Sequence, residues 1–136
     1  MTRTGAKKEV DENFSAGRLK VAKEYRIAAQ EAITLAEPGQ AMNPAISNIV
    51  LAAIAYTDAL TAKRAEVVNQ QDHAAAPKLL RAVMGSAVPQ SQLTRLSRIL
   101  GQKDEVQYGT RSATLERAET LFQDLSEFGN WVEAQL

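Results

Sequence analysis

Apolar residues recur along most of the chain at intervals of three and four, the spacing of an α-helix face. Gly, Pro or polar residues interrupt this pattern at residues 37–39, 68–76, 85–89 and 109–111. No β-branched run has the period of two that a strand requires. The pattern therefore predicts an all-α fold, with helices over residues 14–36, from 44 toward the break at 68, and over 75–84, 91–107 and 112–136.

Four of these helices are long and one is short, with short connections between them. This combination predicts an up-and-down antiparallel four-helix bundle with an additional short helix. The bundle forms one domain over residues 14–136, preceded by a disordered N-terminal tail at residues 1–13. The expected inner stripe of the first helix consists of Val21, Tyr25, Ala28, Ala32 and Leu35, and the small side chains of Ala22, Ala29 and Ala36 widen it.

The second helix has the clearest start, because Asn43 can accept from free backbone N–H groups and Pro44 suits the first helical position. No charged residue occurs from Pro44 to Thr57, and apolar or small side chains cover nearly the whole circumference. Such a helix is normally buried on all sides. We therefore expect neighbours all round it, one of which can be a second copy of the chain in a homodimer.

Composition narrows the possible chemistry. The 136 residues include 16 Lys plus Arg, 16 Asp plus Glu, one His and no Cys. Disulfides, thiolate catalysis and cysteine zinc sites are excluded, no His pair exists for a metal, and no cofactor is expected. The N-terminus lacks the apolar core of a signal peptide, and residues 49–56 are too short to span a bilayer. We expect a cytoplasmic protein without a membrane segment.

Two polar residues stand out. His73 is a candidate general base that Asp72, Asp58 or Glu66 could orient, but Asp72 and His73 also fit a capping pair before the third helix, which is the favoured interpretation. Asp58, on the apolar second helix, is either a functional polar group or the point where the helix leaves the core. The second interpretation is favoured.

Charge is balanced overall but divided along the chain. Residues 78–103 contain only basic charges, whereas the last helix is acidic. The basic residues before Lys103 are Lys78, Arg81, Arg95 and Arg98. They can contact phosphates, or they can pair with the acidic helix. Lys103 continues an apolar stripe, so its side chain either reaches out of the core edge or points into a cleft with Tyr108.

The chain resembles the HEPN superfamily of helical nucleotide-binding domains. The resemblance lies in the order of helices, the small-residue segment Ala45–Tyr56, a His before a short amphipathic helix (His73–Leu80), and the stretch Lys103–Tyr108 before a long acidic helix. It implies the fold, a homodimer, and a nucleotidyltransferase-like protein or RNA as partner. Nuclease members carry Arg, four to six residues, then His, and here Lys103 and Tyr108 stand at those two positions.

Lysine lacks the bidentate fork of arginine, and tyrosine, with a pKa of about 10, is a poor base at neutral pH. The resemblance therefore implies a non-catalytic, homodimeric interaction or nucleotide/RNA-binding module linked to a toxin–antitoxin-type system. Its expected cleft residues are Asn48, Asp58, Lys103 and Tyr108. The alternative is a divergent, metal-independent ribonuclease that uses Lys103, Tyr108 and His73.

Overall fold

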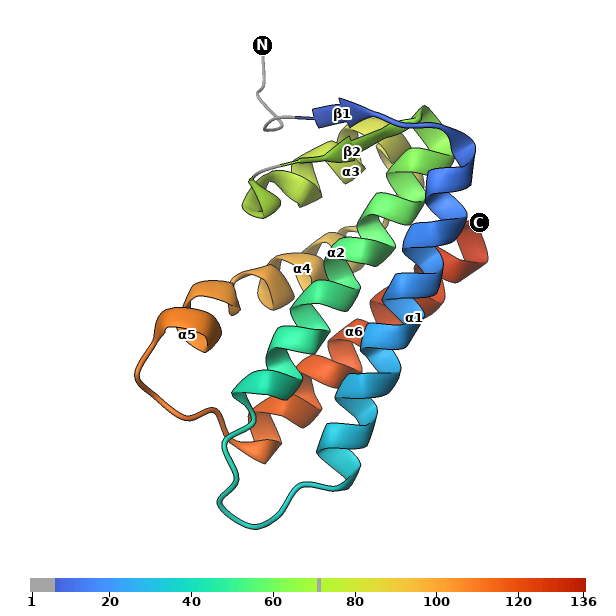
Figure 1. The fold of residues 1–136 in the computed structure, drawn as a ribbon. Coiled ribbons are helices and arrows are strands. Elements are labelled where there is room, and N and C mark those ends of the chain that lie inside the picture. Colours follow the sequence, from blue (N-terminus) through green and yellow to red (C-terminus); the bar gives the residue numbers. More distant parts are fainter. Residues whose placement is uncertain (1–6, 71) are drawn as a thin grey trace.

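The computed structural model describes residues 7–70 and 72–136 and is almost entirely helical, which confirms the all-α prediction (Figure 1). The α-helices are α1 (Glu12–Thr34), α2 (Asn43–Ala65), α3 (Ala76–Met84), α4 (Gln90–Leu100), α5 (Lys103–Tyr108) and α6 (Leu115–Gln135). The remaining elements are strands β1 (Lys7–Glu9) and β2 (Val67–Asn69) and the 3₁₀ turns η1 (His73–Ala75) and η2 (Gly85–Ala87).

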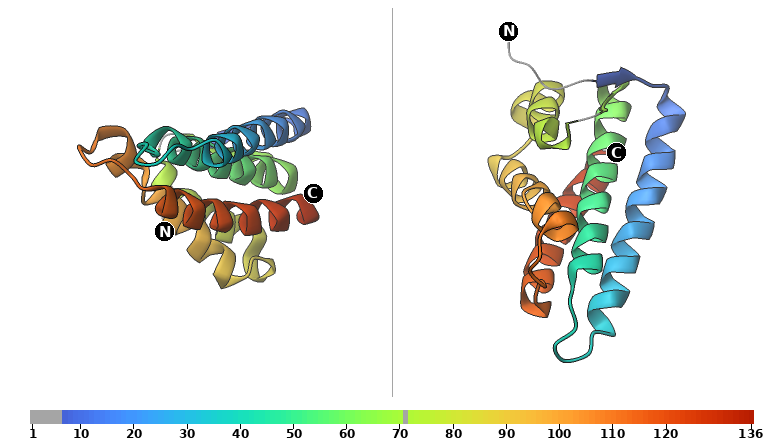
Figure 2. Two further views of the ribbon diagram at one scale, coloured as in Figure 1. Left: turned by 90° about the horizontal axis from the view of Figure 1, so that it is seen from below. Right: turned by 60° about the vertical axis from the view of Figure 1, so that its left-hand side comes forward.

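Three long helices run lengthwise through the molecule. In Figure 1, α1 descends while α2 and α6 rise, with α1 and α2 side by side and α6 packed against both. The helix α4 has only 11 residues, against 23 in α1 and α2, and it crosses the long helices obliquely toward α5 (Figures 1 and 2). The short α3 lies beyond it at the end of the molecule that carries the strands.

Small side chains form the contact between α1 and α2. Ala22 and Ala29 of α1 are fully buried, as are Ala52 and Ala59 of α2, so the two backbones can approach closely. The hydroxyl of Ser15 donates to the carbonyl of Ala59 at 2.6 Å. Ala22 and Ala29, predicted as small residues that widen the inner stripe of α1, thus lie at its buried centre. The larger apolar residues of that stripe lie at its side, and Leu35 is 77% exposed.

The second helix is buried all round within one chain. Residues 52–62 of α2 are all buried, and α1, α3, α4, α5, α6 and β2 pack against the helix. By length and composition α2 could cross a membrane, which the sequence did not predict, but 83% of its most apolar window is buried in the fold. Its all-round apolarity is thus explained without a second copy of the chain.

Regular secondary structure begins earlier in the chain than predicted. Within the range 1–13, Lys7–Glu9 form β1, which pairs antiparallel with β2 so that Lys7 lies opposite Asn69. The side chain of Asp11 then accepts from the backbone N–H of Phe14 at 3.1 Å and caps α1. The prediction of a tail was therefore wrong for residues 7–13, and residues 1–6 lie outside the described residues.

The predicted helix over residues 91–107 is two helices. The first, α4, ends at Leu100, and the chain turns at Gly101 before α5 begins at Lys103. The last helix starts at Leu115, three residues later than predicted, where the Thr114 hydroxyl accepts from the backbone N–H of Arg117 at 3.1 Å.

Asn43 does not cap α2 as predicted. Its side-chain amide instead donates to the carbonyls of Val106 (3.3 Å) and Arg111 (3.1 Å), and its Oδ1 accepts from the backbone N–H of Ala113 at 2.7 Å. The backbone N–H of Met42 donates to the carbonyl of Ala113 at 2.9 Å. Asn43, at the start of α2, therefore holds the segment between α5 and α6. These long-range hydrogen bonds take the place of the local cap that the sequence predicts.

Tyr56 joins the three long helices at the buried centre. Its hydroxyl donates to Oε2 of Glu133 on α6 at 2.8 Å and accepts from Nη1 of Arg26 on α1 at 3.3 Å. Arg26 also donates to Oδ1 of Asn130 at 3.0 Å. The tyrosine ring lies against Gly129 of α6, so closely that a Cβ there would be 2.7 Å from the ring. This packing requires a residue without a side chain.

Candidate functional site

A pocket of about 290 Å³ brings together His73 and Lys103, two residues that the sequence singled out. We call it the His73–Lys103 pocket. His73 comes from η1, and Lys103 comes from the first turn of α5. Asp72, Ala74, Leu100, Gly101 and Asp104 complete its wall. Because the chain turns at Gly101, the two elements meet here although 30 residues separate them in sequence.

Asp72 has the structural role that the favoured interpretation gave it. Its Oδ1 accepts from the backbone N–H of Ala74 at 3.1 Å and caps η1. This cap fixes the turn that presents His73 to the pocket. His73 itself is not part of the cap, and its Nδ1 is buried without a hydrogen-bond partner among the described residues. Of the pair, Asp72 is therefore the capping residue, and His73 is a wall residue of the pocket with one unpaired buried ring nitrogen.

The pKa of His73 is lowered from its ordinary value of 6.5. Burial is the main cause, because it disfavours the charged imidazolium. The positive charges of Lys103 and Arg18 lower the pKa further, whereas Asp72 opposes them. The ring is therefore neutral at pH 7 and can accept a proton or a hydrogen bond beside the Lys103 ammonium.

The coupling between Lys103 and His73 gives a direct prediction. Because the chain contains one histidine, its imidazole can be titrated by NMR without ambiguity. We expect Lys103→Ala to raise the pKa of His73 toward 6.5, since a repelling positive charge is removed. The matched change Lys63→Ala, at the exposed end of α2, should leave the titration unchanged. Identical titrations for wild type and Lys103→Ala would contradict the placement of Lys103.

The other expected cleft residues lie elsewhere. Asn48 is half-buried on α2 and does not line the His73–Lys103 pocket. Tyr108 ends α5, and its side chain lies outside the described residues. Of the expected cleft residues, Lys103 thus lines the His73–Lys103 pocket and Asn48 and Asp58 do not, and a cleft that all of them share stays a prediction.

Asp58 does not mark where α2 leaves the core. It is 7% exposed, and its Oδ2 accepts from Nε of Arg18 on α1 at 3.2 Å. Burial raises the pKa of the carboxyl to about 6, and the charge and hydrogen bond of Arg18 oppose that rise. The sequence pattern did not identify Arg18, because in the sequence this residue is only a charged residue beside the buried face of α1. Asp58 is thus a buried, paired acid.

The basic segment is largely neutralised by α6. Arg95 contacts Glu127 at 2.7 Å, and the two nitrogens Nε and Nη2 of Arg98 donate to the carboxylate of Asp124 at 3.2 and 2.9 Å. Lys78 and Arg81 remain exposed on α3. The expectation of one basic surface fails for Arg95 and Arg98, since their charges are matched within the fold.

Two further arginines, Arg111 and Arg117, line a separate polar pocket that the sequence did not predict. Arg111 falls in a segment that the pattern identifies only as a break between helices. Within the described residues, no group of three or more His, Asp or Glu is placed to hold a metal ion. No protein-family model, curated protein or solved structure matches this chain.

Proposed function

We propose that this protein is a cytoplasmic, HEPN-like helical module that binds a nucleotide or RNA without catalysing a reaction. In this proposal α1, α2, α4 and α6 are the helices of an up-and-down four-helix bundle, and a nucleotidyltransferase-like protein or RNA is the partner. The meeting of Lys103 and His73 in one pocket carries the proposal. A lysine ammonium attracts phosphate, and a neutral imidazole accepts hydrogen bonds from hydroxyls.

Binding can be tested with single-stranded RNA and with nucleoside monophosphates by fluorescence anisotropy and calorimetry. We expect Lys103→Ala to weaken binding about tenfold, while Lys63→Ala, which removes the same charge at an exposed site, changes it less than about twofold. Equal losses in the two variants would show non-specific attraction. Absence of binding to the wild type would contradict the proposal.

A ribonuclease is the second candidate, favoured by the lowered pKa of His73 next to Lys103. The neutral imidazole would take the proton of an RNA 2′-hydroxyl while the 2′ oxygen bonds to phosphorus. The bond to the 5′ oxygen then breaks, and the imidazolium returns the proton to that leaving oxygen. Lys103 would offset the charge on the phosphate. RNA cleavage that disappears in His73→Gln would establish this candidate, and an inert wild type would eliminate it.

The homodimer in this proposal needs a surface other than residues 52–62 of α2, which one chain already covers. Arg18 contacts Asp58 on one side of the α1–α2 pair, and Arg26 contacts α6 on the other. On α1, Val21 and Tyr25 follow Arg18 at helical spacing. On α2, Leu51 precedes Asp58 by two turns. These three half-buried apolar residues therefore lie on the Arg18–Asp58 side of the helix pair, which α6 does not cover.

We propose that a second copy of the chain packs on this side. Tyr25→Glu should then convert a dimer to a monomer in light scattering, because it places a charge in an apolar contact. Ile27→Glu is the matched control, since Ile27 is 54% exposed on another side of α1. A wild type with the mass of one chain at micromolar concentration would contradict the dimer.

A further inference from the structure

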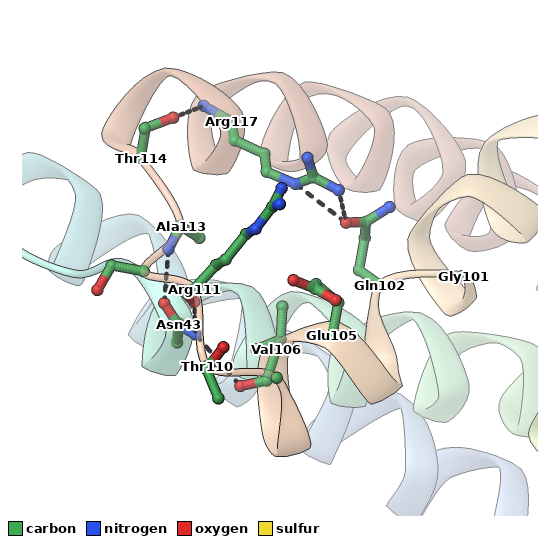
Figure 3. Close-up of a pocket in the computed structure, with 12 residues that line it drawn as sticks. Asn43, Gly101, Gln102, Glu105, Val106, Thr110, Arg111, Ala113, Thr114 and Arg117 are labelled. Atoms are coloured by element: carbon green, nitrogen blue, oxygen red, sulfur yellow. Dashed lines mark hydrogen bonds between the residues drawn. The ribbon is translucent and has the colours of Figure 1, made fainter.

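A second pocket lies between α5 and the start of α6. It has a volume of about 890 Å³, and its wall includes Gln102, Glu105, Thr110, Arg111 and Arg117 (Figure 3). We call it the Arg111–Arg117 pocket. It shares Gly101 with the His73–Lys103 pocket, but its charged residues are different.

Two guanidinium groups converge in this pocket. Figure 3 shows the Arg111 side chain extending toward Arg117, with Glu105 at the side. Among the described residues, neither arginine forms an ion pair with a carboxylate, although five other basic residues of the chain do. Like charges side by side repel, and an anion between them would remove the repulsion. An anion in the pocket would therefore meet two positive groups and one carboxylate, Glu105.

The pocket is fixed before any ligand arrives. Gln102 Oε1 accepts from Nε of Arg117 at 3.0 Å and also from its Nη2, which holds the guanidinium in one orientation. On the other side, the hydrogen bonds of Asn43 to Arg111 and Ala113 hold the loop backbone. A site whose groups are already oriented loses less entropy on binding.

We propose that the Arg111–Arg117 pocket binds the phosphate group of a nucleotide or of RNA. Guanidinium groups recognise phosphate through paired N–H donors, and two of them match its charge even with Glu105 nearby. The start of α6 borders the same pocket and adds a favourable dipole, with Thr114 as its cap. The inference deepens the proposed function, on which it rests for the class of ligand.

The test begins with inorganic phosphate alone, followed by calorimetry or by amide NMR shifts. We expect wild-type protein to bind phosphate and Arg111→Gln/Arg117→Gln to bind it at least about tenfold more weakly. The control Lys20→Gln/Lys63→Gln removes the same charge from exposed positions outside the pocket and should bind as wild type. Equal weakening in both double variants, or no phosphate binding by the wild type, would overturn the inference.

Folding can be separated from binding with a single variant. The guanidinium of Arg111 makes no hydrogen bond among the described residues, so Arg111→Gln should melt as wild type while still losing phosphate affinity. Arg117 is less suited to this purpose, because its side chain also bonds Gln102. An Arg111→Gln protein that melts as wild type and binds phosphate equally well would overturn the inference.

RNA oligonucleotides with and without a 5′-phosphate then distinguish the source of the phosphate. Tighter binding of the phosphorylated RNA, lost in Arg111→Gln/Arg117→Gln, assigns the pocket to a terminal phosphate, whereas equal loss for both RNAs assigns it to the backbone. Phosphate binding without RNA binding supports this pocket and contradicts the proposed function. RNA binding that requires Lys103 but neither arginine supports the proposed function and contradicts this pocket.

Discussion

Gly129→Ala is expected to lower the free energy of unfolding by about 1–3 kcal/mol, the usual penalty for overpacking a core. The new Cβ would lie 2.7 Å from Cε2 and 2.9 Å from Cζ of Tyr56, and 3.1 Å from Nη1 of Arg26. The tyrosine ring cannot withdraw freely, because its hydroxyl is held by Glu133. The gain in helix propensity from Gly to Ala, about 1 kcal/mol, offsets only part of this loss.

Gly17→Ala is the matched control for this prediction. Gly17 lies in α1, and an added Cβ there meets no atom within 4 Å. Without a clash, the change should raise the free energy of unfolding by about 0.5–1 kcal/mol. Urea denaturation of the two variants measures both effects. If Gly129→Ala and Gly17→Ala changed the free energy of unfolding in the same direction, the Tyr56–Gly129 contact would not limit packing.

Arg18→Met is expected to cost about 3 kcal/mol at pH 8 and much less at pH 5. At pH 8 the variant leaves the Asp58 carboxylate buried without its partner. At pH 5 the carboxyl is largely protonated, since burial raises its pKa to about 6, and no charge needs the guanidinium. Urea denaturation at the two pH values measures the difference.

The sign of the pH dependence follows from the same pKa. The folded pKa of Asp58, about 6, lies above the ordinary value of 3.8, so the folded state binds more protons between them. Stability contributed by Asp58 therefore falls as pH rises through 6. His73, with a lowered pKa, acts in the opposite direction, and the part of its shift that Arg18 causes is lost equally in Arg18→Met and in Arg18→Met/Asp58→Asn.

Asp58→Asn provides the control for the buried pair. In Arg18→Met/Asp58→Asn the carboxyl is absent, so the extra loss at pH 8 should disappear. A loss from Arg18→Met that is equal at pH 5 and pH 8 would contradict the role assigned to the pair, and would indicate that the arginine acts through packing alone.

The helices were predictable because burial imposes a local period, but the contacts between them were not. On α1 the period identified a stripe that includes Ala22 and Ala29, but it did not show that these small residues are buried most deeply while Leu35 is exposed. Asn43 has the sequence signature of a cap, yet partners far along the chain bind its side chain. Tertiary contacts of this kind leave no local signal.

The candidate site was predicted in part for the same reason. Lys103 stands out because a charged residue occupies the next position of an apolar stripe, and His73 because it is the only histidine. Their meeting depends on the turn at Gly101, within a stretch whose period predicts an uninterrupted helix. The pairing of Arg95 and Arg98 with α6 was one of two alternatives, and only the register between α4 and α6 decides between them.

The contacts of Asn43 also bear on the order in which the chain folds. Its three side-chain hydrogen bonds span 63 to 70 residues of sequence, whereas α1 and α2 are joined by a short connection. Contacts between distant residues close large loops and form late. The α1–α2 hairpin should therefore fold early, and the loop that carries Arg111 should dock last.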